Sequence, residues 1–141
     1  LQNPKPIRPL KYNSISAKNA GDHPKSSAAD AGALTEYLMG LTVAEVKAGS
    51  LKPNPSVQGR AIFTKKMPCG GCHTYSVKGE TQGGLSGPSL VGSSKRLNPD
   101  WILAYLANTK YFKPVRDMPD FAGILNPKDM ENVAAYVATF E

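Results

Sequence analysis

Apolar residues recur at helical spacing in several stretches of this chain, and no stretch alternates strictly between apolar and polar positions. In the first stretch the spacing is followed by Leu34, Tyr37, Leu38 and Leu41, with Gly40 as a stop signal. Residues 42–45 (TVAE) then have the spacing of a capping box, and Gly49 follows as a second stop. The pattern therefore predicts two short helices between residues 29 and 49.

Three later helix starts share one signature, an asparagine followed by a proline. They are Asn54-Pro55, Asn98-Pro99 and Asn126-Pro127. In each pair the asparagine side chain is an acceptor at the N-cap, and the proline ring fixes φ at the first helical position. Half-buried stripes follow the second and third starts, formed by Ile102, Tyr105, Leu106 and Thr109, and by Met130, Val133, Val137 and Phe140. The predicted fold class is all-α, with a long loop between the first two of these helices that contains Gly79, Gly83, Gly84 and Gly87.

The composition changes along the chain and divides it into two parts. Residues 1–28 contain four prolines and few large apolar residues, which is typical of irregular chain. We therefore predict an N-terminal extension over residues 1–56 and one small domain over residues 57–141. The chain starts at Leu1 without a leader segment, and we expect a mature protein from which a leader or membrane anchor has been removed. No apolar stretch reaches the roughly 20 residues that a membrane-spanning helix needs.

The net charge of +6 indicates an acidic partner. The basic residues form no dense run and are not interleaved with aromatic residues, so the sequence does not predict nucleic-acid binding. Several of them lie near the candidate site described next, namely Lys65, Lys66, Lys78, Lys110, Lys113 and Arg116. A basic ring of this kind would speed encounter with an acidic redox protein, although ordinary solvated side chains would give the same pattern.

The only two cysteines form the segment Cys69-Gly-Gly-Cys72-His73, the attachment signature for c-type haem. Two thiols on one turn can add to the two vinyl groups on one side of a porphyrin, and the histidine then ligates the iron. A zinc site would need two further ligands, and the only other histidine is His23, in a proline-rich segment. A dithiol redox centre is expected after a strand, which the pattern lacks. A structural cysteine pair and an exposed loop histidine are the ordinary alternatives.

Residues 57–141 resemble the class I cytochromes c, which carry one haem ligated by His and Met. The resemblance rests on Gly59 and Phe63 in the first helix, Val133 and Tyr136 in the last, and the segment 87–90 (GPSL). It implies a small cytochrome c fold wrapped around one covalent haem c. It also implies that the carbonyl of Pro88 accepts a hydrogen bond from the imidazole of His73, which would fix the tautomer of the ligand.

The second axial ligand is expected to be one of four methionines. Met39 lies outside the domain, Met67 is too close to the attachment site, and Met130 lies on the apolar stripe of the last helix. Met118 remains, in a loop that ends with Pro119, and its alternative is a loop methionine that fills a gap. The resemblance places Tyr105 near this ligand. Trp101 has two equal interpretations, a partner of a haem propionate or a half-exposed residue near the helix start.

These features predict a one-electron carrier rather than an enzyme, because an iron with both axial ligands filled binds no substrate. The alternative is a small haem enzyme or a protein that binds peroxide or gas, in which Met118 is displaced. The extension would be a spacer from a lost anchor or a strap that docks on another subunit, which suggests a respiratory or sulfur-oxidising complex. The family attaches haem after export, so a periplasmic location is expected.

Overall fold

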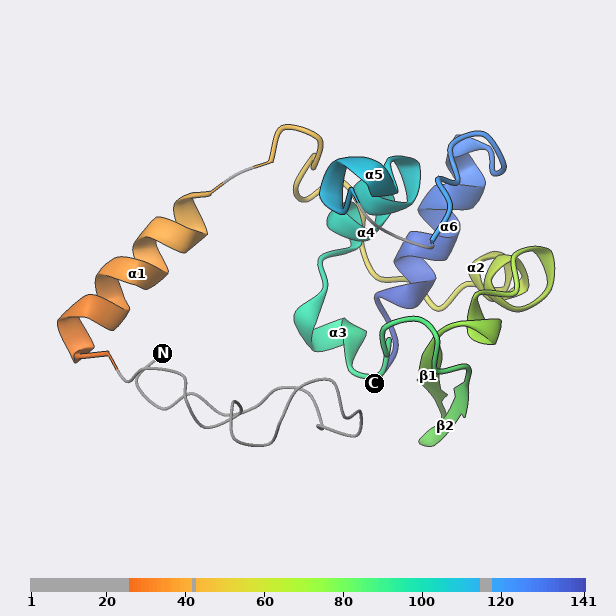
Figure 1. Cartoon of the computed structure of the whole chain (residues 1–141). Coiled ribbons are helices and arrows are strands. Elements are labelled where there is room, and N and C mark those ends of the chain that lie inside the picture. The colour runs from red at the N-terminus through yellow and green to blue at the C-terminus, as the bar shows by residue number, and fades with distance from the viewer. Residues whose placement is uncertain (1–25, 42, 115–117) are drawn as a thin grey trace. The chain divides into compact units, whose positions relative to one another are not determined.

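The computed structural model describes residues 26–41, 43–114 and 118–141. The chain divides into two compact units, Leu1–Val43 and Ala44–Glu141 (Figure 1). Helix α1 (Ala28–Gly40) is the described helix of the first unit, and the other elements belong to the second. In chain order these are α2 (Val57–Ala61), η2 (Ile62–Lys66), η3 (Cys69–Gly71), β1 (Thr74–Val77), β2 (Glu80–Gly83), α3 (Ser93–Arg96), α4 (Pro99–Ala107), α5 (Thr109–Phe112) and α6 (Pro127–Val137).

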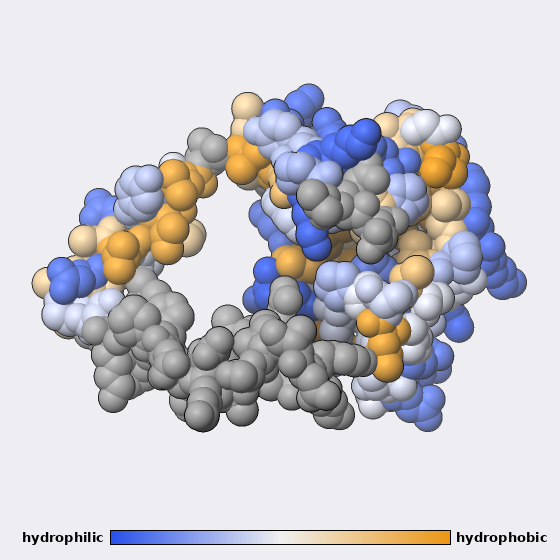
Figure 2. Space-filling view, in the orientation of Figure 1, coloured by the Kyte–Doolittle hydropathy of each residue, from blue (hydrophilic) through white to orange (hydrophobic). Residues whose placement is uncertain are grey.

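Helix α1 forms where the apolar spacing predicted the first short helix. The hydroxyl oxygen of Ser27 accepts a hydrogen bond from the amide of Asp30 at 3.1 Å, and the hydroxyl donates to the Asp30 carboxylate at 2.7 Å. This cap satisfies one of the free amides of the first turn. No residue of α1 is buried, and hydrophobic residues (orange) line it in Figure 2. The large side chains Leu34, Tyr37, Leu38 and Met39 are all exposed.

The second short helix, predicted over residues 42–49, does not form, and that prediction is wrong. Thr42 lies outside the described residues, and residues 43–56 are turns and irregular chain. The reason is a competing acceptor. The carboxylate of Asp100, only 4% exposed, accepts hydrogen bonds from the amides of Gly49 (2.7 Å) and Leu51 (2.8 Å) and from the hydroxyl of Ser50 (2.5 Å). These bonds take the amides away from a helical ladder.

Residues 44–56, which we call the strap, contact the rest of the second unit at two further places. The amide of Asn54 donates to the carbonyl of Ala135 in α6 at 2.9 Å. A hydrogen bond to Glu45 raises the pKa of the Tyr111 hydroxyl above its ordinary value. The strap therefore folds with the second unit, although the sequence analysis assigned it to the extension. A functional boundary at residues 56/57 stays a prediction.

Two of the three asparagine caps are confirmed. The side chain of Asn98 accepts from the amide of Asp100, and that of Asn126 accepts from the amide of Asp129, both at 2.8 Å. The third prediction is wrong, because α2 is capped by Ser56, whose hydroxyl oxygen accepts from the amide of Gly59 at 3.0 Å. Asn54 lies two residues before Ser56, and its backbone amide donates to the carbonyl of Ala135 in α6.

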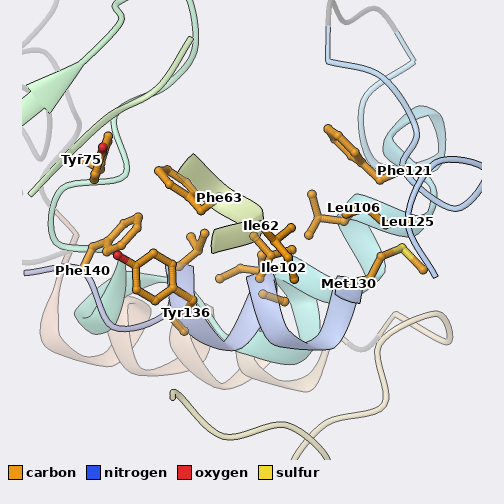
Figure 3. Close-up of a cluster of buried hydrophobic side chains, with 14 residues drawn as sticks. Ile62, Phe63, Tyr75, Ile102, Leu106, Phe121, Leu125, Met130, Tyr136 and Phe140 are labelled. Carbon is orange, nitrogen blue, oxygen red and sulfur yellow. The ribbon is translucent and has the colours of Figure 1, made fainter. Parts of the chain in front are cut away.

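The core of the second unit forms where α6 packs against α2 and α4. Phe63 is completely buried, and its ring contacts Tyr75, Tyr136 and Phe140 at centroid distances of 4.8, 5.9 and 5.1 Å. Figure 3 shows these four aromatic residues at one end of the buried cluster. The stripes predicted for the last two helices are confirmed in this core: Ile102, Leu106, Met130, Val133, Val137 and Phe140 are all buried.

Gly59 lies where α2 crosses α6. A Cβ atom at this position would lie 2.5 Å from the backbone oxygen of Asn132 and 2.6 Å from the Cβ of Tyr136. Only glycine fits so close an approach, because neither neighbour is the mobile end of a side chain. The two helices therefore cross closely at Gly59, one of the residues on which the resemblance rests.

The all-α expectation needs a correction, because strands β1 and β2 pair as an antiparallel hairpin within the predicted glycine-rich loop. Lys78 and Gly79 connect the strands with φ of 54° and 81°. Positive φ at both central residues is the condition for a type I′ hairpin turn. Each strand has four residues, too few to show an alternating pattern in the sequence.

Candidate functional site

The two cysteines and the histidine lie on one tight turn. Element η3 begins at Cys69, and its carbonyl accepts hydrogen bonds from the amides of Cys72 (3.2 Å) and His73 (2.9 Å). Cys69 is half-buried, Cys72 is exposed, and both are free thiols. The structure thus presents two thiols and an imidazole from five consecutive residues.

The thiol of Cys69 is protonated at neutral pH. Burial raises its pKa from 9.0 to about 11. The reactive cysteine of a dithiol redox centre has a lowered pKa, because the thiolate is the attacking species. The environment of Cys69 is therefore the opposite of the one that dithiol chemistry needs.

The imidazole of His73 has a fixed orientation. Its Nδ1 lies 2.7 Å from the carbonyl oxygen of Pro88. A carbonyl can only accept, so Nδ1 donates, and the neutral ring then has its lone pair on Nε2. Nε2 forms no hydrogen bond within the part of the chain that the structure describes. The contact implied by the resemblance is present, and it leaves one ring nitrogen available as a ligand.

Glycines hold the ring and the turn in place. A Cβ atom on Gly87 would lie 2.8 Å from both Cε1 and Nδ1 of His73, so the ring packs directly on this backbone. The turn formed by residues 69–73 is called the attachment turn below. Side chains on Gly83 and Gly84 would overlap its backbone at His73 and Gly71. From the sequence these glycines were expected in a loop, but their contact with the turn was not predicted. Their clustering was the available signal.

A second set of hydrogen bonds ties the glycine segment to the turn. The amide of Gly84 donates to the carbonyl of Gly70 at 2.8 Å, and the hydroxyl of Thr74 donates to the carbonyl of Gly84 at 2.7 Å. The amide of Gly87 donates to the carbonyl of Cys72 at 2.7 Å. These bonds hold the segment that leads to Pro88 against the turn that carries His73.

Met118 and Tyr105 lie on other elements. Met118 is half-buried, packs against the hydrophobic core and follows residues 115–117, which lie outside the described residues. Tyr105 lies on α4 and stacks on Trp101 at a centroid distance of 5.1 Å, with Phe112 5.8 Å from Tyr105. No hydrogen bond joins Met118 or Tyr105 to the attachment turn among the residues described. Their roles as ligand and ligand neighbour stay predictions.

The lysines predicted near the site are exposed, namely Lys65, Lys66, Lys78, Lys110 and Lys113. Lys66 forms an ion pair with Asp129 at 2.5 Å, which takes up part of its charge. Arg116 and His23 lie outside the described residues. Whether the exposed lysines act as one docking ring stays a prediction.

The donor set fits a c-type haem. Two free thiols and an oriented imidazole share one turn, and a thioether is available on a separate loop. The described residues contain no cluster of three or more His, Cys, Asp or Glu side chains able to hold a metal ion. Within the described ranges no helix has the length and apolar character needed to cross a membrane.

The comparisons with known proteins point the same way. The family model for cytochrome C oxidase, cbb3-type, subunit III matches residues 55–137, more than half of the chain. No curated protein matches the chain. The match covers the attachment turn, the Pro88 segment and Met118 within one continuous region.

Proposed function

Because the chain belongs to the cytochrome c oxidase, cbb3-type, subunit III family and is a c-type cytochrome, we propose that it is a one-electron carrier. The haem is attached through Cys69 and Cys72 and ligated by His73 and Met118. When bound, the haem supplies an iron that cycles between the ferrous and ferric states. The observation that carries the proposal is the contact of His73 Nδ1 with the Pro88 carbonyl.

His73 has a defined task in this proposal. Its Nδ1–H is held by a carbonyl acceptor, so the ring keeps one tautomer and the lone pair of Nε2 stays available to a metal. Gly87 supports the ring from its side. A ligand fixed in this way needs little reorganisation between the two oxidation states.

Met118 completes the ligand pair. A thioether is a soft and neutral donor, which favours the ferrous state and gives a positive reduction potential. With His73 and Met118 both as ligands, the iron would bind a small molecule only after Met118 had left. This favours electron transfer over a catalytic haem.

The test is the absorption spectrum of the mature protein and of two methionine variants. Methionine ligation to ferric haem produces a weak near-infrared band. We expect Met118→Ala to lose this band and to bind carbon monoxide in the ferrous state. The matched control is Met130→Leu, because Met130 is 8% exposed and lies in the core. A band that survives Met118→Ala would refute the ligand assignment, and a colourless mature protein would refute the function.

We further propose that the protein acts outside the cytoplasm, as an electron-relay subunit of a larger oxidoreductase complex. Three features support this: the family match, the exposed apolar residues of α1 and the positive charge. Apolar side chains in this number are commonly buried against a partner. The partner that receives α1 is a protein subunit, and an acidic redox protein meets the exposed lysines.

Limited proteolysis tests the role of the extension. In the isolated protein we expect cleavage before the strap, leaving a fragment that starts near Ala44, because Asp100 protects residues 49–51. In the complex we expect α1 to be protected as well. Equal cleavage of α1 with and without the complex would contradict docking through this helix.

A further inference from the structure

The loop that carries Met118 is closed at its base by hydrogen bonds between Thr109 and Asp120. Thr109 is completely buried, and its amide and its hydroxyl both donate to the same carboxylate oxygen of Asp120, at 2.6 and 2.5 Å. The two residues are separated by 11 positions in the sequence. The side chain of Asp120, two positions after Met118, is therefore joined to the first residue of α5.

A second closure is formed by the next residue along the chain, Phe121. The amide of Phe121 donates to the carbonyl of Leu106 at 2.8 Å. Both side chains are buried, and Figure 3 shows them together at the end of the core opposite Phe63. The returning chain is therefore anchored to α4 by its backbone and by the core, and Thr109 with Asp120 extends this anchor toward Met118.

The Thr109 hydroxyl also reaches the backbone of Met118. It lies 3.3 Å from the Met118 carbonyl oxygen, a longer contact than the one to Asp120. The hydrogen of the hydroxyl is directed mainly at the carboxylate, and the carbonyl takes the weaker share. Thr109 thus contacts the residues on both sides of Pro119, through the backbone carbonyl of Met118 and the side chain of Asp120.

We propose that Thr109 and Asp120 form a clamp that positions Met118 as a ligand. The proposal rests on the proposed function, in which Met118 binds the iron. A closed loop has fewer conformations to lose when the methionine binds, so the clamp strengthens ligation without touching the iron. Both members are positioning residues. Opening the clamp frees the loop and lets external ligands compete with the sulfur.

The test uses the mature haem-loaded chain and measures the affinity of the ferric form for imidazole, which competes with Met118. Thr109→Val keeps the shape and removes the hydroxyl. We expect imidazole to bind roughly tenfold more tightly to this variant, equivalent to about 1.4 kcal/mol. Thr109→Ser retains the hydroxyl and is expected to stay within about twofold of the wild type. The near-infrared band is expected to weaken in Thr109→Val only.

The control is Thr139→Val, which removes a hydroxyl that donates to the Tyr136 carbonyl at 2.7 Å, near the end of α6. Denaturant unfolding of all variants separates a loss of stability from a loss of ligation. Imidazole affinity that stays at the wild-type value in Thr109→Val, or rises equally in Thr139→Val, would overturn the clamp.

If Thr109→Val does not yield haem-loaded protein, Asp120→Asn serves as the second test variant. Asp120→Asn exchanges charge-assisted hydrogen bonds for neutral ones of roughly half the strength, so imidazole is expected to bind about threefold more tightly. No change in this variant would count against the clamp. Failure of the proposed function is recognised separately, since the wild type itself would then lack the near-infrared band; failure of the clamp alone leaves that band in place.

Discussion

Replacing Asp100 with alanine removes the carboxylate that holds the strap to α4. Three donors point at it, the amides of Gly49 and Leu51 and the hydroxyl of Ser50, at 2.5 to 2.8 Å. A hydrogen bond to a charged group contributes about 1.5–3 kcal/mol when its partner is left buried. The strap lies at the surface, so its donors can reach water once it detaches. We therefore expect Asp100→Ala to cost about 3 kcal/mol in unfolding free energy, well below the sum of three buried bonds.

The assay is denaturant unfolding of the mature protein with matched variants. Asp100→Asn keeps one acceptor oxygen and is expected to cost about half as much as Asp100→Ala, since neutral hydrogen bonds are roughly half as strong. The control is Asp129→Asn, because Asp129 also lies in the first turn of a helix but forms an exposed ion pair with Lys66. Exposed pairs contribute at most about 1 kcal/mol.

The pH dependence gives a second, independent check. Burial of Asp100 opposes its charged form, but the bonds from Ser50, Gly49 and Leu51 outweigh this and hold the pKa of the carboxyl below 3.8. A group with a lowered folded pKa stabilises the protein fully above its unfolded pKa, and this contribution is lost as pH falls through the folded value. The difference in stability between wild type and Asp100→Asn should thus be constant near neutral pH and shrink below 3.8. A cost for Asp100→Ala within about 0.5 kcal/mol of zero, the range of an ordinary surface substitution, would refute the reasoning.

Two further predictions concern the helix crossing and the charged surface. Gly59→Ala places a Cβ 2.5 Å from the backbone oxygen of Asn132, and it should cost about 1–2 kcal/mol in unfolding free energy although alanine has the better helix propensity. The control is Gly32→Ala, which should be neutral or stabilising because a Cβ at Gly32 meets nothing within 4 Å. Exchange of the exposed Lys65 and Lys113 for Glu should slow electron transfer with an acidic partner at low salt and leave the reduction potential nearly unchanged; stopped-flow kinetics that show equal rates at low salt would argue against a lysine docking surface.

The chemistry of this protein could be read from a few adjacent residues. The segment from Cys69 to His73 predicts a c-type haem, because thiol addition and ligation need those residue types at that spacing. The helices that start at Asn98 and Asn126 were also predictable, since their caps and apolar stripes are local patterns. The predictions that failed were those in which a local sequence pattern competes with hydrogen bonds or contacts to residues far away in the sequence.

Residues 42–49 show this competition most clearly. Their capping box and stop signal favoured a helix, but the carboxylate of Asp100, about fifty positions away, accepts hydrogen bonds from the amides of Gly49 and Leu51 at the end of this stretch. The hairpin was missed for a related reason: its strands are short, and Gly83 and Gly84 are required by contact with the turn that carries His73 rather than by their neighbours in sequence.

The sequence by itself determined the helical core and the identity of the groups at the site. Only the tertiary structure decided which nitrogen of His73 is free, which chain segment supports its ring, and how Thr109 meets Asp120 beneath Met118. The physical reason is the range of the interactions. Caps and helical stripes act within a few residues, whereas hydrogen bonds between distant segments depend on a fold that has already brought them together.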